Sequence, residues 1–163
     1  MIHEVSGDIL LTKAHALAHG IAPNDPFDQG LARALREQWP AMHRDYHHYA
    51  NQTHPKPGEI WTWGTSGKRI LALLTQEGGF EHGARPGRAT VENVNHCLRR
   101  LRHELEKEGI TSVALPRLAT GVGKLEWEEV RPLIDKHLGN LSIPIFVYTT
   151  YKPGVQLKSG HIC

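Results

Sequence analysis

Residues 116–127 read PRLATGVGKLEW, and this stretch joins a predicted strand to a predicted helix. The apolar run TSVAL (111–115) precedes it, and the amphipathic segment LEWEEVRPLIDKHLG (125–139) overlaps its end. Residues 119–123 carry small side chains, two of them glycines. Such a junction is either a tight turn or a place where backbone amides approach a ligand at a helix N-terminus. The stretch alone leaves both interpretations open.

Strand and helix patterns alternate along the rest of the chain, which predicts an α/β fold. We expect a three-layer α/β/α domain with a mixed, mostly parallel central sheet over residues 1–151, and a loose polar tail at 152–163. Asp28 is expected to cap the first helix, and Thr90 and Gly109 to bound the third. The strands are predicted at 2–7, 14–20, 59–64, 68–76, 111–115 and 143–150, and the helices at 28–39, 41–52, 89–109 and 125–139.

Composition narrows the function class. The 163 residues suit one domain, and a net charge of +2 is too balanced to indicate a nucleic-acid binder. No apolar run is long enough for a membrane span, no signal peptide is visible, and the two cysteines favour a reducing cytoplasm. Twelve histidines include no HExxH pattern. We therefore expect a cytoplasmic monomer with no membrane partner, no metal and no cofactor.

Ligands of such folds bind beyond the carboxyl ends of the central strands. Three junctions qualify: Gly7 to Ile9, the long loop 20–31, and residues 118–125. The loop 20–31 brings a second glycine-containing helix start, so two such loops could flank a diphosphate. Neither is a Walker loop. Asp8 follows a strand and could accept from a base or a ribose, although an Asx-turn or a helix cap is the simpler interpretation.

The ordered set GDIL, ALAHGIAPNDPFDQGLARAL, LALLTQ, PRLATGVGKLEW and FVYTT resembles a macrodomain over about residues 2–151. It is most similar to the branch of hydrolases that remove terminal ADP-ribose from acidic side chains, and of antitoxins that remove it from DNA. The resemblance implies ADP-ribose, ADP-ribosylated protein or ADP-ribosylated DNA as partners. The ligand-binding residues that it implies are Asp8, Ile9, Gly30, Leu31, Ala32, Thr75, Leu118, Ala119, Thr120, Gly121, Val122, Gly123, Tyr148 and Thr150.

The chain departs from catalytic members of that branch at three positions. Gln76 stands where some hydrolases carry a lysine, which excludes an imine at that position. Gly123 matches an aspartate of the acidic-side-chain hydrolase, and Ala22 aligns with an asparagine that many catalytic macrodomains have. We therefore expect a water-based mechanism in which Asp28, Asn24 and Gln76 are the candidate catalytic residues.

Two functions from different classes stay open on the sequence. One is an ADP-ribosyl glycohydrolase that acts on protein or DNA, and we favour it because the first loop retains an asparagine, two aspartates and a glutamine. The other is a reader that binds ADP-ribose without turnover. A third reading, a nucleotide-binding α/β domain unrelated to ADP-ribose, is disfavoured only by the family resemblance.

A glycine-rich loop also carries two arginines, Arg85 and Arg88. They could contact phosphates, although a solvated turn is the favoured interpretation.

Overall fold

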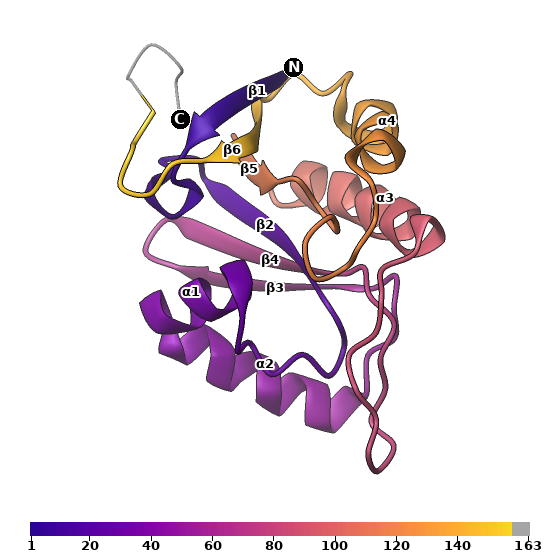
Figure 1. Cartoon of the computed structure of the whole chain (residues 1–163). Coiled ribbons are helices and arrows are strands. Elements are labelled where there is room, and N and C mark those ends of the chain that lie inside the picture. The colour runs from indigo at the N-terminus through magenta and orange to yellow at the C-terminus, as the bar shows by residue number, and fades with distance from the viewer. Residues whose placement is uncertain (158–163) are drawn as a thin grey trace.

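The structure is a computed structural model that describes residues 1–157. It is an α/β fold with one six-stranded sheet (Figure 1). The strands are β1 (Ile2–Gly7), β2 (Ala16–Ile21), β3 (Ile60–Thr65), β4 (Lys68–Leu74), β5 (Val113–Pro116) and β6 (Ile145–Tyr151). The helices are the 3-10 turn η1 (Ile9–Leu11), α1 (Gly30–Gln38), α2 (Pro40–Thr53), α3 (Val91–Lys107) and α4 (Trp127–Leu138).

The sheet confirms the predicted mixed, mostly parallel topology. Its strand order is β1-β6-β5-β2-β4-β3, and only β3 runs antiparallel to its neighbour β4. The apolar run at residues 70–74 of β4 is fully buried, as its lack of alternation predicts. The carboxyl ends of the parallel strands β2, β4 and β5 therefore meet at one edge.

One hydrophobic cluster lies on each face of the sheet. Helices cover both clusters, so the fold has three layers, with the sheet in the middle. Alternate residues of β2 show the division, since Ala16 and Ala18 belong to one cluster and Leu17 and Ile21 to the other. The helices α3 and α4 contribute to the first cluster, and α1 and α2 to the second. Figure 1 shows these helix pairs on opposite sides of the sheet. No helix within residues 1–157 is long and apolar enough to cross a bilayer.

The N-cap predicted for α3 is confirmed, and the N-cap predicted for α1 is not. The Thr90 hydroxyl caps α3 by accepting from the N–H of Asn93 at 3.0 Å, as expected. The prediction of Asp28 as the cap of α1 is wrong, because the N-cap is Gln29 and its side chain makes no capping hydrogen bond. The N-terminus of α1 therefore presents its backbone N–H groups without a side-chain cap.

The described part of the C-terminal tail, residues 152–157, packs against the end of β1, which corrects the expectation of a loose tail. The N–H of Asp8 donates to the Val155 carbonyl at 2.8 Å, and the N–H of Lys152 donates to the Gly7 carbonyl at 2.9 Å. The Gln156 amide donates to the Leu11 carbonyl. Residues 158–163, which include Cys163, lie outside the described part of the chain.

Candidate ligand-binding cleft

The carboxyl edge of the sheet carries a cleft with two adjoining compartments, which share Gly30, Leu31 and Pro116. The first compartment has a volume of about 300 Å³ and the second about 410 Å³. The other residues that line the first compartment, here called the polar compartment, are His19, Gly20, Asp25, Gln29, Ala32, Gln76, Arg117, Ala119, Thr120, Gly121, Val122 and Gly123. The second, here called the apolar compartment, is further lined by Gly7, Ile9, Leu10, Ala34, Tyr148 and Tyr151.

One wall of the cleft is the N-terminus of α1. Phe27 fixes the approach to it, since its ring is fully buried and its backbone has a φ of 58°, a left-handed conformation that is unusual for this residue type. Within residues 1–157, no group accepts from the N–H groups of Gly30, Leu31 or Ala32. Free amides and the positive end of the helix dipole together make this wall attractive to an anion.

The opposite wall is the loop between β5 and α4. The Thr120 hydroxyl donates to the Arg117 carbonyl at 2.8 Å, and the N–H of Leu125 donates to the Ala119 carbonyl at 3.0 Å, which close the loop into a turn. Ala119 is left-handed, with a φ of 65°. Across the described chain, no acceptor pairs with the N–H groups of residues 121–123. The loop therefore offers a second set of free amides to the same cleft.

The two glycines of this loop have different reasons to be glycine. A Cβ atom on Gly121 would have no heavy atom within 4 Å, so the space beside it is open. A Cβ atom on Gly123 would lie 2.6 Å from the Ala119 carbonyl oxygen and 2.9 Å from the Ala89 Cβ. Gly121 therefore leaves room for a ligand, and Gly123 leaves room for the loop's own packing.

The apolar compartment has the composition of a site for a flat ring. Ile9 and Tyr148 are buried and line it, and the exposed Tyr151 lies at its edge. Thr150, which the resemblance places here, is exposed and is not among the lining residues. The pairing of β6 with β1 shifts register between Tyr148 and Thr150, which interrupts the strict alternation of side chains. Tyr148 and Tyr151 therefore both line the compartment although they lie three residues apart.

Asp8 takes the cap role that the sequence offered as its simpler interpretation. One carboxylate oxygen accepts from the N–H of Leu10 at 3.0 Å as the N-cap of η1, and the other accepts from the N–H of Gly154 at 2.9 Å. Asp8 is 8% exposed and lies between Gly7 and Ile9, which both line the apolar compartment. Its carboxylate thus joins η1 to the tail at the border of the cleft.

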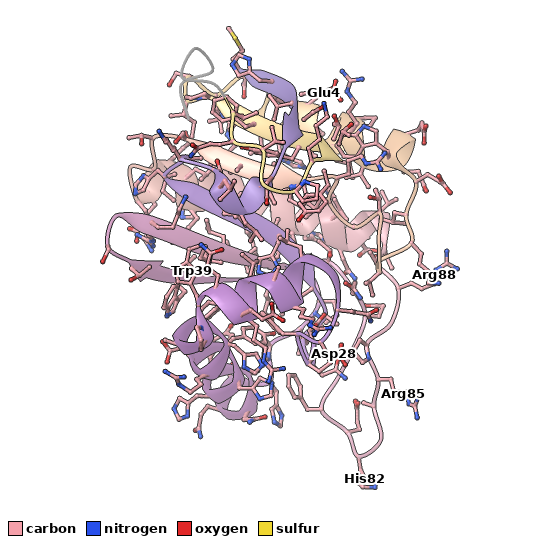
Figure 2. The ribbon with its side chains drawn as sticks, turned by 60° about the vertical axis from the view of Figure 1, so that its left-hand side comes forward. Glu4, Asp28, Trp39, His82, Arg85 and Arg88 are labelled. Atoms are coloured by element: carbon pink, nitrogen blue, oxygen red, sulfur yellow. The ribbon has the colours of Figure 1, made fainter. Side chains whose placement is uncertain are left out.

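The three candidate catalytic residues do not come together. Gln76 lines the polar compartment, whereas Asn24 lies in a separate small cavity, where its amide donates to the Ala84 carbonyl at 3.3 Å. Asp28 is exposed on the loop before α1 and lines neither compartment (Figure 2). The aspartate that does line the polar compartment is Asp25, which also lines the small cavity of Asn24.

The groups of Gln76 and Asp25 are held by hydrogen bonds. The Gln76 Nε2 donates to the Gly87 carbonyl at 2.9 Å, which leaves its Oε1 as the acceptor end of the amide. The Asp25 carboxylate accepts from the N–H of Phe27 at 2.8 Å and from that of Ala22 at 3.4 Å. Burial raises the pKa of Asp25 above its usual value, against the lowering effect of those two amides.

Thr75 and Leu118 are fully buried and support the cleft from behind. Neither lines a compartment, and Leu118 belongs to the hydrophobic cluster under α3 and α4. A Cβ atom on Gly20 would lie 2.7 Å from the Thr75 hydroxyl oxygen and 3.3 Å from a Leu118 methyl group. These residues therefore shape the compartment floor by contact with Gly20.

Three further residues line the polar compartment: His19, Gln29 and Arg117. Sequence reasoning missed His19 and Arg117, and it counted Gln29 only among the polar residues of the first loop. Arg117 follows the proline that ends β5, and its place in the quoted stretch was the available signal. His19 sits in an apolar strand and gives no sequence signal of its own. Within residues 1–157 no cluster of three or more histidine, cysteine or acidic side chains has the arrangement of a metal site.

The loop 78–88 extends from the body beside the cleft. It is joined to its base by the antiparallel bridge between Gln76 and Ala89 and by stacking of Phe80 on His54 with ring centroids 4.6 Å apart. Figure 2 shows Arg85 and Arg88 pointing away from the body. The favoured interpretation of these arginines, a solvated turn, agrees with their exposure.

The sequence has detectable relatives among known proteins. The profile of the Macro domain family matches residues 19–134. The human protein named ADP-ribose glycohydrolase OARD1 is 27% identical over 89% of this chain and 89% of its own length. A Thermosipho africanus protein named a DNA ADP-ribosyl transferase-DNA ADP-ribosyl glycohydrolase fusion is 24% identical over 94% of this chain and 44% of its own length.

Solved structures show the same fold. The macrodomain of Thermus aquaticus DarG superposes with a TM-score of 0.80 at 23% identity, covering 91% of this chain and 98% of that one. The macrodomain of Mycobacterium tuberculosis DarG superposes with a TM-score of 0.81 at 22% identity, covering 94% and 99%. At these identities the likeness concerns the arrangement of strands and helices.

Proposed function

The chain belongs to the macrodomain family, and from that premise we propose that it binds ADP-ribose and hydrolyses the bond between ADP-ribose and a carrier. The observation that carries the proposal is the pair of facing amide sets, Gly30–Ala32 on α1 and Gly121–Gly123 on the loop opposite. A diphosphate between them would receive hydrogen bonds from both walls without a lysine.

The two compartments suit different parts of ADP-ribose. The apolar compartment, with Ile9 and Tyr148, suits the adenosine, and the amide walls suit the phosphates. The ligand then continues into the polar compartment, where Asp25 and Gln76 would face the distal ribose. The family resemblance and the printed names of the relatives support ADP-ribose over other nucleotides.

The hydrolytic step that we propose uses water. The water oxygen forms a bond to the anomeric carbon of the distal ribose, the carrier leaves with the bond's electrons, and the water's proton passes to a phosphate oxygen or to bulk water. The Gln76 Oε1 would hold the water by accepting from it, because its Nε2 is engaged by Gly87. The Asp25 carboxylate would stabilise the positive charge that develops at the ribose.

A reader without turnover is the second candidate, and one observation favours it. Both oxygens of Asp25 are engaged by backbone N–H groups, and Asp28 lies outside the cleft, so the described chain places no free carboxylate beside Gln76. The names of the relatives favour hydrolysis over this alternative.

Binding and turnover are tested in sequence. Calorimetry should give a dissociation constant on the order of micromolar for ADP-ribose and far weaker binding for AMP, which lacks the diphosphate and the distal ribose. The protein is then incubated with ADP-ribosylated protein and with ADP-ribosylated DNA, and free ADP-ribose is measured by mass spectrometry. Release from one carrier identifies the substrate. Tight binding with no release from either carrier establishes the reader, and equal affinity for AMP and ADP-ribose contradicts the proposal.

A further inference from the structure

His19 lies on β2, in the interior of the sheet, and lines the polar compartment. It belongs to β2, on the face that Leu17 and Ile21 share with α1 and α2, and it is 2% exposed. Asp25 and Gln76 line the same compartment. A buried polar ring therefore belongs to the wall of the polar compartment.

Both ring nitrogens of His19 are buried, and neither has a hydrogen-bond partner within the described residues. Phe27 packs edge-on against the ring with centroids 6.1 Å apart, and its apolar edge supplies no acceptor. Buried polar side chains in proteins are almost always paired, because an unpaired one destabilises the fold. Because His19 lines the polar compartment, a ligand bound there is the available source of a partner for the ring.

We propose that the His19 ring turns toward the polar compartment when the ligand binds, and that one of its ring nitrogens then forms a hydrogen bond with a hydroxyl group of the distal ribose. The inference rests on the proposed function, since it takes ADP-ribose as the ligand. With the adenosine in the apolar compartment and the phosphates between the amide walls, the distal ribose is the part of the ligand that reaches the polar compartment, which His19 lines.

The chemistry of the ring fits a hydroxyl group and not a phosphate. Burial lowers the pKa of His19 to about 4, so the imidazole is neutral at physiological pH. A neutral imidazole has one donor and one acceptor nitrogen, and a hydroxyl group can pair with either one. The ring carries no positive charge that would draw the phosphates away from the amides. The same low pKa makes His19 a weak base, so we assign it to ligand recognition and not to proton removal from water.

The test uses the variant His19→Leu and two ligands that differ only in the distal ribose, ADP and ADP-ribose. Calorimetry of the variant is expected to show about a tenfold loss of ADP-ribose affinity, the size of one hydrogen bond, and ADP affinity within about twofold of wild type. The thermal midpoint of the ligand-free variant is expected to equal or exceed that of wild type, because an unpaired polar group has been removed. His19→Gln, which keeps a donor and an acceptor, should recover part of the loss.

His43→Leu is the matched control. His43 packs against Phe27 with ring centroids 5.2 Å apart, and it does not line the cleft. Its Nε2 is also buried and has no hydrogen-bond partner among residues 1–157. Its replacement should leave both affinities unchanged. A measurement on wild type needs no variant: the ¹⁵N resonances of the His19 ring should shift with ADP-ribose and stay in place with ADP.

The outcomes separate this inference from the proposed function. If wild type binds no ADP-ribose, the proposed function fails and the inference fails with it. If wild type binds ADP-ribose and His19→Leu binds it equally well, the inference alone is overturned. An equal loss for ADP and ADP-ribose also overturns it, because that result assigns His19 a purely structural role.

Discussion

Gly121 and Gly123 stand two residues apart in one loop, yet a Cβ atom would meet open space on the first and the Ala119 carbonyl at 2.6 Å on the second. The difference separates a residue kept small for a ligand from one kept small for the fold. Both residues belong to the same sequence motif, so the motif alone cannot make this distinction.

Gly121→Glu should abolish ADP-ribose binding and leave the fold intact. The new side chain would enter the space beside the free amides and place a carboxylate next to the phosphates, so we expect a loss of at least about a hundredfold in affinity. Calorimetry measures the loss, and circular dichroism checks the fold. Retained affinity in a folded variant would place the phosphates elsewhere.

Gly123→Ala is the matched control in the same loop. The added methyl group would overlap Ala119 and Ala89, so the free energy of unfolding should fall by about 1–3 kcal/mol. Denaturant unfolding measures this change. A variant with wild-type stability would show that the loop adjusts more easily than its contacts indicate.

Asp8→Ala should destabilise the fold more clearly than it weakens binding. The substitution removes the cap of η1 and the acceptor for Gly154, two hydrogen bonds to a charged group that is almost fully buried. We expect a loss of about 2–3 kcal/mol in the free energy of unfolding. Asp8→Asn is the control, because asparagine is also a good N-cap and retains one acceptor oxygen. A large loss of ADP-ribose affinity with unchanged stability would instead support a direct contact with adenine.

The sequence predicts the fold well because its signals are local and agree with one another. The unbroken apolar run of β4 and the apolar stripe of α3, with its Thr90 cap, each specify type and position. The predicted N-cap of α1 is wrong by one residue. Aspartate is a common N-cap residue type, which favours Asp28, but the backbone enters the helix at Gln29. Capping preferences therefore indicate where a helix begins only to within a few residues.

The sequence predicts which backbone segments form the cleft, but it does not predict which side chains of the first loop line it. Glycine-containing loops before helices indicated both amide walls, since free N–H groups need no particular side chain. The loop 22–29 contains a left-handed turn at Phe27, which carries no glycine signal, and hydrogen bonds from Ala22 and Phe27 that hold Asp25. In this loop Asp25 lines the cleft, whereas Asn24 and Asp28 do not.

Wild-type protein should form no covalent adduct with ADP-ribose under borohydride, because the amide of Gln76 cannot form an imine. Gln76→Lys should form one, since its amine would lie in the polar compartment and could condense with the open-chain aldehyde of the distal ribose. Intact-protein mass spectrometry detects the reduced adduct. An adduct on wild type would refute the water mechanism, and its absence from Gln76→Lys would place the distal ribose away from residue 76.

His19 should make stability depend on pH in the acidic range. Its pKa is about 4 in the folded protein and close to 6.5 when unfolded, so the unfolded chain binds an extra proton between those values. The contribution of His19 to the free energy of unfolding is therefore fully present above about pH 6.5. It decreases as the pH drops, and the loss reaches about 3 kcal/mol near pH 4. The difference between wild type and His19→Leu across pH 7 to 4 isolates this contribution. Parallel profiles for the two proteins would contradict it.

Asp25 and Asp28 form a matched pair for testing catalysis, because they lie three residues apart and only Asp25 lines the cleft. Asp25→Asn should lower the turnover rate by about tenfold or more with a small change in ADP-ribose affinity, since it removes the charge that stabilises the ribose cation. Asp28→Asn should leave the turnover rate near that of wild type.

The pH dependence of turnover offers a second check on Asp25. Because burial raises the pKa of Asp25, the turnover rate should begin to fall at a higher pH than it would with an aspartate of ordinary pKa. Single-turnover release of ADP-ribose from the identified carrier measures both effects. A larger defect for Asp28→Asn than for Asp25→Asn would return the catalytic assignment to the loop's exposed carboxylate.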